Sequence, residues 1–345
     1  MNWRRNAHGR KKLSFLFTAT IFGLTFLAIK LFGFSTFEEK EDEKYQKVFT
    51  SHYQIFALNL PAQINFAGEP VPIDLLDVRE KMDRELLVNT YWQSQTLLFL
   101  KRSNKWFPII EPILKKNNIP DDFKYLPLIE SGFTNVVSPA GATGFWQLMK
   151  SAAKERGLTI NDEVDERYHV EKATEAACQY LLEAHDKFGS WTLAAASYNM
   201  GMAGLNRRLE AQQVNNYYDL LLNEETSRYV FRILAIKKIL GDPAAHGFQY
   251  REKDLYPPIV GVDTEITESV EDLAAYARSK GISYKVLKLL NPWLRKGKLT
   301  LKAGQQYTVQ LPDAELANQL VMDKSILLSV EPSKEKNVIE EEGSK

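Results

Sequence analysis

Apolar residues recur at three- and four-residue spacing over much of residues 81–241, which is the period of an amphipathic helix. The stretch MDRELLVNTYWQSQTLLFLKR, shortly after Val78, predicts one long helix. Asn104 is expected to cap the next helix, and Pro120 with two aspartates opens another. Gly157 and Gly189 stand where glycine ends a helix, after FWQLMKSAAKER and VEKATEAACQYLLEAHDKF. With TLAAASYNMG and ETSRYVFRILAIKKILG, these segments predict an all-helical domain over residues 81–241.

The pattern changes after Gly241. Residues 242–255 are expected to be a linker, and residues 256–313 predict a strand, two helices and a second strand. Ser269 and Asp272 suggest a capping box before VEDLAAYARSKG, Ser283 begins YKVLKLLN, and QYTVQL alternates as a strand does. Residues 314–345 form a polar C-terminal tail that is expected to be partly disordered.

The N-terminal part indicates export. Residues 1–12 are basic, and residues 13–34 are apolar over a length that can cross a bilayer. The basic flank predicts that the N-terminus stays on the cytoplasmic side. The segment has no cysteine near its end and no clear cleavage site, which excludes a lipoprotein and favours an uncleaved membrane anchor over a signal peptide. Residues 35–80 then form an extended tether. The expected fold class is mainly α, with an N-terminal transmembrane helix and a small C-terminal βααβ domain.

Composition gives no sign of several classes of function. Lys and Arg number 44, as do Asp and Glu, so nothing marks a nucleic-acid-binding protein. The single cysteine, Cys178, cannot form an intramolecular disulfide and is expected to be a core residue. The five histidines are scattered, so no metal site and no cofactor are expected.

One isolated carboxyl group is the main candidate for chemistry. Glu130 follows the apolar run YLPLI and precedes the loop SPAGATG, with Gly141 and Gly144, and no other acid occurs before Glu155. Burial at a helix end would raise the pKa of such a carboxyl group and suit it to act as a general acid. Trp146 and Gln147 follow, on the expected first turn of a helix. A solvated glutamate at a helix end, and a core tryptophan, are the alternative interpretations.

Two later segments add polar side chains. Tyr198 and Asn199 adjoin a glycine in ASYNMG, and Tyr229 lies in ETSRYV. Taken alone, Tyr198 and Asn199 could be a helix C-cap, and Tyr229, on an apolar helix, is more typical of a core residue.

Together, IESGFTNVVSPAGATGFWQ, ASYNMG and ETSRYV resemble, in this order and spacing, the motifs of the soluble lytic transglycosylase (SLT) domain, which has a lysozyme-like fold. The resemblance implies that Glu130 is the catalytic acid and base, with Ser131 as its structural neighbour. It also implies five substrate-binding residues: Ser138, Gln147, Tyr198, Asn199 and Tyr229. Here Gly132 stands where the family usually has alanine. Residues 256–313 resemble a LysM module with an atypical first strand, which leaves open whether the module binds glycan or only packs.

The resemblance implies a lytic transglycosylase that cleaves the β-1,4 bond between N-acetylmuramic acid (MurNAc) and N-acetylglucosamine (GlcNAc) in peptidoglycan. The product would be a 1,6-anhydro-MurNAc end, formed without water, in the periplasm of a bacterial envelope and next to the inner membrane. Two alternatives stay open. One is a catalytically silent peptidoglycan-binding scaffold. The other is a hydrolytic muramidase of the same fold, whose second carboxylate could come from Asp162, Glu163, Asp165 or Glu166.

Overall fold

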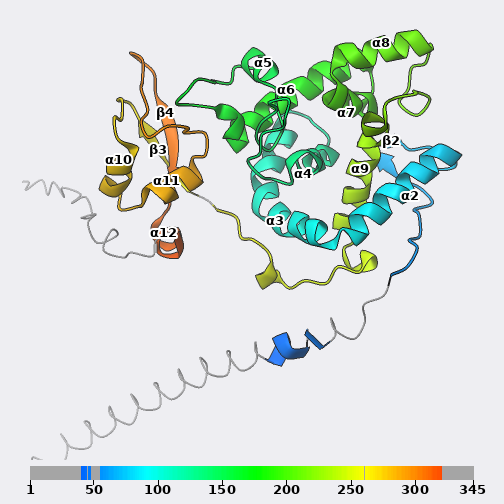
Figure 1. Ribbon diagram of the computed structural model, residues 1–345, viewed down its shortest axis with the longest axis horizontal. Coiled ribbons are helices and arrows are strands. Elements are labelled where there is room, and N and C mark those ends of the chain that lie inside the picture. The colour runs from blue at the N-terminus through cyan, green and yellow to red at the C-terminus, as the bar shows by residue number, and fades with distance from the viewer. Residues whose placement is uncertain (1–39, 45, 48–54, 260, 321–345) are drawn as a thin grey trace, which may run out of the picture. The chain divides into compact units, whose positions relative to one another are not determined.

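The computed structural model describes residues 40–44, 46–47, 55–259 and 261–320 (Figure 1). Its contacts divide the chain into two units, residues 1–57 and 58–345. Residues 40–44 and 46–47 of the first unit are helical. The candidate membrane segment, residues 13–34, lies outside the described residues. Within the described part of the chain, no helix is both long and apolar enough to cross a membrane.

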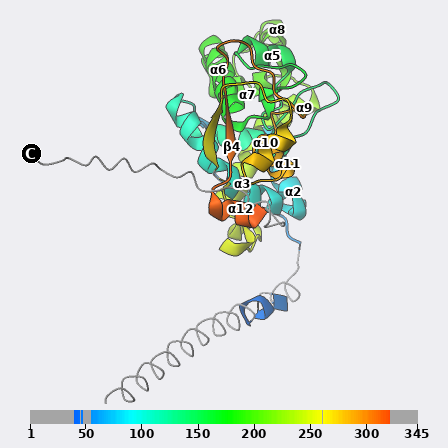
Figure 2. The same ribbon diagram turned by 90° about the vertical axis from the view of Figure 1, so that its left-hand side faces the viewer.

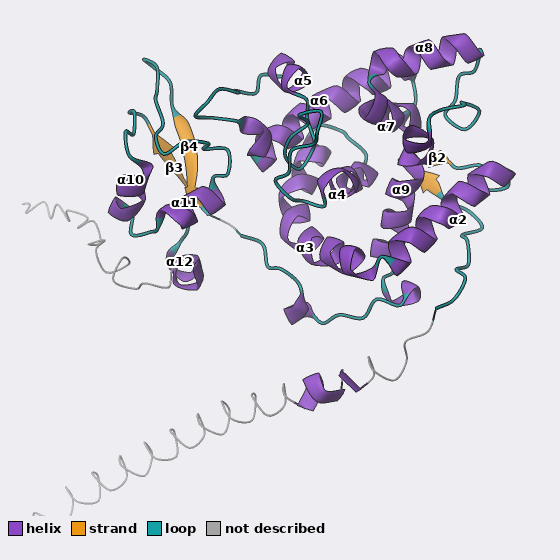
Figure 3. Ribbon diagram, in the orientation of Figure 1, coloured by secondary structure: helices purple, strands orange, loops and turns teal. Residues whose placement is uncertain are grey.

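The second unit is mainly helical, and its described strands form two small antiparallel sheets (Figure 3). The first sheet is a hairpin of β1 (Asn65–Phe66) and β2 (Glu69–Pro70). Phe66 is fully buried and packs edge-on against Phe123. The Glu69 carboxylate accepts backbone N–H bonds from Trp191 and Thr192, at 2.6 and 3.0 Å. A carboxylate at a helix start satisfies free N–H groups there, so the hairpin is fixed to the first turn of α7 (Trp191–Met200).

The long helix expected from Val78 onward is two helices, α2 (Leu76–Tyr91) and α3 (Gln93–Lys116), which are separated at Trp92. Trp92 has non-helical torsions, φ −84° and ψ 57°. The Asn89 carbonyl there accepts a hydrogen bond from the Thr96 hydroxyl. The cap predicted at Asn104 is also wrong. The buried face of α3 runs on from Phe99 to Leu114, and this continuous packing outweighs the capping tendency of one asparagine.

Shorter helices follow. They are η1 (Asp121–Tyr125), α4 (Leu126–Ser131), α5 (Lys150–Glu155) and η2 (Glu166–Tyr168). The helix expected to begin at Phe145 starts only at Lys150, because Thr143 and Leu148 bridge each other and hold residues 144–147 in a turn. Trp146 and Gln147 therefore lie in this turn and not on a helix.

The core of this domain is built around α6 (Val170–Phe188), α7 and α9 (Glu224–Gly241), with α8 (Met202–Gln212) following α7. The alanines of α6 and α7 are buried, and Cys178 is a fully buried core residue, as predicted. The helix ends predicted at Gly157 and Gly189 are confirmed, since both glycines are left-handed, with φ of 81° and 66°. Two short turns, η3 (Ala244–His246) and η4 (Glu252–Asp254), lead to the C-terminal part.

The predicted strand–helix–helix–strand unit is confirmed. It consists of β3 (Val262–Ile266), α10 (Leu273–Ser279), α11 (Tyr284–Leu290) and β4 (Tyr307–Leu311), and α12 (Ala314–Leu320) follows. In the antiparallel register Thr264 lies opposite Val309, and α11 packs against β4 (Figures 1 and 2). The predicted capping box is wrong. Asp272 alone caps α10, because Ser269 instead accepts the Leu301 N–H at 2.9 Å.

The C-terminal strand–helix–helix–strand domain has its own core, and that core includes two residues from an earlier segment, Val164 and Tyr168. Backbone hydrogen bonds also connect this segment to the C-terminal domain. The Asp165 N–H donates to the Trp293 carbonyl at 2.9 Å, and the Arg295 N–H donates to the Glu163 carbonyl at 2.7 Å. The C-terminal unit is therefore packed directly on residues 163–168.

Candidate active site

Glu130 lies in the last turn of α4, and the chain leaves that helix through Gly132 with φ 60°. A side chain at Gly132 would be tight, since a Cβ would lie 3.0 Å from the Phe99 ring and 3.1 Å from the Gln95 amide. Gly132, where the family usually has alanine, is thus explained locally, because the backbone there is left-handed and packs against α3.

Glu130 is half-buried, and its carboxyl group is in contact with α9. The Tyr229 hydroxyl donates to its Oε1. Arg232, one turn further along α9, donates to the Ile129 carbonyl at 2.8 Å. Burial raises the pKa of Glu130, and the charge of Glu225 adds to this, whereas the Tyr229 bond and the charge of Arg232 oppose it. The net effect is a raised pKa, which keeps a proton on this carboxyl group to higher pH than in water.

The loop after α4 is held mainly by bonds within itself. The Ser138 hydroxyl accepts the Ala142 N–H at 3.0 Å. The Gln147 amide donates to the carbonyls of Gly144 and Val136, at 2.7 and 3.1 Å, and Gln147 has a left-handed φ of 47°. Both side chains therefore shape the loop, and neither bonds to Glu130 in the described structure.

Arg167 fixes this loop from outside, which sequence reasoning missed. Its guanidinium donates to the carbonyls of Gly141 and Leu148, at 3.0 and 3.2 Å. Asp165 holds the same guanidinium through two bonds, at 3.0 and 2.8 Å. All of these groups are largely buried, so Arg167 acts as a clamp on residues 138–148.

The two loop glycines do different things. At Gly144, with φ 79°, a Cβ would lie 2.1 Å from the Arg167 carbonyl oxygen, so glycine is needed for the close approach of two backbone segments. At Gly141, with φ 86°, a Cβ would meet nothing within 4 Å. The space beside Gly144 is therefore filled by the Arg167 backbone and is not open to a ligand.

Tyr198 and Asn199 lie at the end of α7 and bind different neighbours. The Tyr198 hydroxyl donates to the Trp146 carbonyl at 2.7 Å, and the fully buried Trp146 in turn donates to Thr174 at 2.8 Å. Burial and then the charge of Glu130 raise the pKa of Tyr198 well above its usual value. Tyr198 therefore ties the turn of residues 144–147 to α7, close to the candidate acid.

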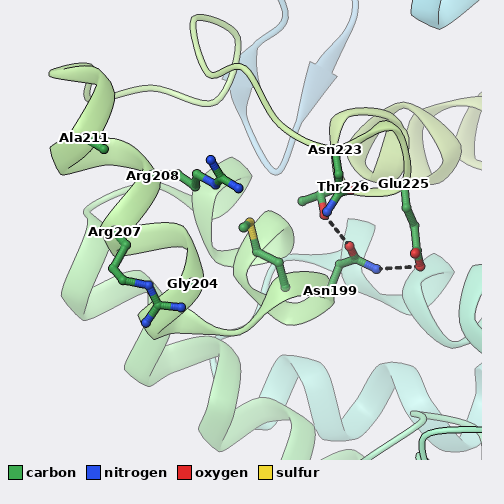
Figure 4. Close-up of a pocket in the computed structure, with 9 residues that line it drawn as sticks. Asn199, Gly204, Arg207, Arg208, Ala211, Asn223, Glu225 and Thr226 are labelled. Atoms are coloured by element: carbon green, nitrogen blue, oxygen red, sulfur yellow. Dashed lines mark hydrogen bonds between the residues drawn. The ribbon is translucent and has the colours of Figure 1, made fainter.

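Asn199 is bound to the start of α9 (Figure 4). Its amide donates to Glu225 Oε1 at 3.2 Å, and its carbonyl oxygen accepts from the Thr226 hydroxyl at 2.7 Å. Asn199 is thereby bonded to Glu225, whose charge adds to the effect of burial on the pKa of Glu130. Of the predicted site residues, only Tyr229 bonds to Glu130 directly.

Sequence reasoning also missed Arg232 and Glu225. The signal was present for both, since Arg232 follows Tyr229 by three positions on one helix and Glu225 precedes it by four.

The other acids that sequence analysis considered are engaged elsewhere or exposed. Glu163 accepts from the Thr300 N–H at 2.7 Å, Asp165 binds Arg167, and Glu166 accepts from the Thr159 N–H at 2.6 Å and from Lys172. Asp162 is exposed. Across the described residues, no group of three or more His, Cys, Asp or Glu side chains could hold a metal ion.

Comparison with known proteins supports the two domains separately. Residues 107–220 match the model of the transglycosylase SLT domain, a range that contains Glu130, the loop, Tyr198 and Asn199 but stops before Tyr229. Residues 262–315 match the model of the soluble lytic transglycosylase C-terminal LysM-like domain.

Two curated relatives are similar over part of their length. Membrane-bound lytic murein transglycosylase D of Escherichia coli K12 is 29% identical over 238 residues, which is 67% of this chain and 51% of that protein. A putative tributyltin chloride resistance protein of Alteromonas sp. strain M-1 is 31% identical over 122 residues, which is 35% of this chain and 59% of that protein. The chain spans about half the length of the first relative. From its two matched regions, the chain carries a transglycosylase SLT domain followed by a LysM-like domain of the soluble lytic transglycosylase type.

Proposed function

We propose that the chain is a lytic transglycosylase, which cleaves the MurNAc–GlcNAc β-1,4 bond of peptidoglycan and leaves a 1,6-anhydro-MurNAc end. The observation that carries this proposal is the setting of Glu130. It is a carboxyl group with a raised pKa that accepts a hydrogen bond from Tyr229 of α9, and it lies in the region that matches the SLT domain.

In the first step, Glu130 acts as a general acid. Its raised pKa favours the protonated form, and the proton passes to the glycosidic oxygen as the bond to the MurNAc anomeric carbon breaks. The leaving GlcNAc takes this proton as its hydroxyl group. The Tyr229 bond and the nearby Arg232 charge both favour the carboxylate that remains, so they stabilise the product of this step.

In the second step, the Glu130 carboxylate acts as a base. It removes the proton from the C6 hydroxyl of the same MurNAc, whose oxygen then bonds to the anomeric carbon and closes the anhydro ring. No second protein carboxylate is required, because the substrate supplies the nucleophile. We assign substrate positioning to Tyr198, Asn199 and Tyr229, and we assign the shape of the loop wall to Ser138 and Gln147.

One observation favours a second candidate, a hydrolytic muramidase. The exposed Glu225 is near enough for its charge to act on Glu130, and a base in such a position could activate water. The two functions differ in product, since hydrolysis leaves a reducing MurNAc end that is heavier by one water.

Mass spectrometry of the fragments released from purified peptidoglycan by residues 36–345 tests the proposal. Anhydro ends support the water-free mechanism, and reducing ends would assign the enzyme to the muramidases. Glu130→Gln should abolish release of either product and leave glycan binding intact. If neither the wild-type chain nor the variant releases fragments while both bind, the chain is a scaffold.

We also propose a place in the cell envelope, with residues 13–34 as a membrane anchor and the SLT domain in the periplasm. The printed name of the E. coli relative, a membrane-bound enzyme, supports this location. For the C-terminal domain, the direct packing on residues 163–168 supports a structural role beside any affinity for glycan. Washing membranes that contain the full chain with high salt tests the anchor, because an anchored protein stays in the pellet.

A further inference from the structure

An open pocket of about 600 Å³ lies between α8 and the start of α9 (Figure 4). Arg207 and Arg208 line it from α8, and Asn223, Glu225 and Thr226 line it from the α9 side. Asn199 completes the wall. Glu225 lines this pocket and its charge acts on Glu130, so the pocket lies near the candidate acid.

Two positive charges at this pocket have no ion-pair partner among the described residues. Neither Arg207 nor Arg208 forms an ion pair or a hydrogen bond with any residue that the structure describes. Three other arginines near the site have partners: Arg167 pairs with Asp165 and Arg228 with Glu85, whereas Arg232 donates to the Ile129 carbonyl. The acid in the pocket, Glu225, already accepts from the Asn199 amide. The asparagines are engaged as well, since Asn199 bonds to Glu225 and Thr226 and Asn223 accepts from the Thr226 N–H. The pocket therefore presents to a ligand two guanidinium groups that are unpaired among the described residues.

A guanidinium group pairs best with a planar anion such as a carboxylate, which can accept two parallel bonds. The proposed substrate carries such anions close to the cleaved bond, because each MurNAc bears a short peptide stem with free carboxylates. A pocket of this volume has room for a group of that size.

We propose that Arg207 and Arg208 bind carboxylates of the peptide stem on the MurNAc at the cleavage site. The pocket would thus make the enzyme select glycan that bears stems over glycan stripped of them. This inference rests on the proposed function for its substrate, and on the unpaired arginines for its chemistry.

The test measures binding apart from turnover. The dissociation constant for soluble glycan strands is determined by calorimetry with the 345-residue chain carrying Glu130→Gln. Three ligands are used: strands with intact stems, strands whose stem carboxylates are amidated with carbodiimide and ammonia, and strands stripped of stems by an amidase. The test variant adds Arg207→Ala and Arg208→Ala. The matched control adds Arg79→Ala and Lys238→Ala, which removes equal charge at exposed residues that do not line the pocket.

We expect the arginine pair variant to bind intact strands about tenfold more weakly, and the control to bind them as the parent does. For amidated strands the pair variant and the parent should bind alike. An equal loss on intact and amidated strands, or an equal loss in the control, would overturn the inference. A loss that persists on stripped strands would also overturn it, since their remaining carboxylate belongs to the MurNAc lactyl group.

A parallel turnover assay on the chain with native Glu130 separates the two proposals. If that chain releases no anhydro ends while the charge-dependent difference in binding holds, the proposed function fails and the arginine site stands. If anhydro ends appear and the binding difference is absent, the arginine site fails and the proposed function stands.

Discussion

Replacement of Gly144 by alanine tests whether the loop depends on the close approach of two backbone segments. The structure gives two separate costs for this change. A left-handed φ of 79° is unfavourable for alanine by about 1–2 kcal/mol. The new Cβ would also lie 2.1 Å from the Arg167 carbonyl oxygen, so that the backbone must move, which costs about 1–3 kcal/mol more. Together they amount to about 2–5 kcal/mol in the free energy of unfolding.

Gly141→Ala is the matched control, because it has the same backbone cost without the collision. Its φ is 86° and its Cβ would meet nothing within 4 Å, so a loss of about 1–2 kcal/mol is expected. Equilibrium unfolding in urea, followed by circular dichroism, compares the two variants with the parent chain. The difference between them isolates the collision.

Two results would refute this reasoning. Equal destabilisation by the two substitutions would mean that the Arg167 backbone yields easily and that the clamp does not fix the loop. A Gly144→Ala variant with unchanged stability would mean that the loop adopts another conformation in solution.

Three further predictions concern the acid and the C-terminal domain. Tyr229→Phe removes a hydrogen bond to the Glu130 carboxylate worth about 1.5–3 kcal/mol, so kcat/KM should fall about 10- to 150-fold. The pKa of Glu130 should also rise, which would move the alkaline limb of the pH–rate profile to higher pH. The control Tyr180→Phe, which loses a bond to the Ser197 carbonyl, should leave that limb in place. Because the pKa of Glu130 is raised in the folded state, the wild-type chain loses stability as pH rises above the unfolded value of 4.5, so Glu130→Gln should raise the melting temperature relative to wild type at pH 8 and not at pH 4. Val164→Ala should destabilise the C-terminal unit by about 1–3 kcal/mol, measured as faster amide exchange in β4 with little change in α7, and equal exchange in the two elements would contradict the shared core.

Features that local sequence determines were predictable. The glycines that end α5 and α6, the Ser283 cap and the alternating strand before Leu311 each depend on a few neighbouring residues, and the structure bears them out. The errors arose where packing outweighed local preference. Asn104 is a good capping residue, yet the buried face of α3 carries the helix through it.

The site was harder to predict because its contacts join distant positions. Tyr229 reaches Glu130 across 99 positions, and the sequence gives no reason for that pairing beyond family resemblance. Arg167 was missed because it contacts the loop through the backbone carbonyls of Gly141 and Leu148, and a sequence does not show such bonds. The roles of Ser138, Gln147, Tyr198, Asn199 and Tyr229 in substrate binding remain predictions, as does the catalytic role of Glu130.

The attachment of the C-terminal domain affects how the molecule would bear mechanical load. Val164 packs in the core of that domain, and the N–H of Asp165 donates to the Trp293 carbonyl. Asp165 lies only two positions before Arg167. A pull on the domain would therefore act on the Arg167 clamp and, through it, on the loop beside Glu130. A domain held by a flexible linker alone would isolate the candidate active site from such a force, whereas this attachment would transmit it.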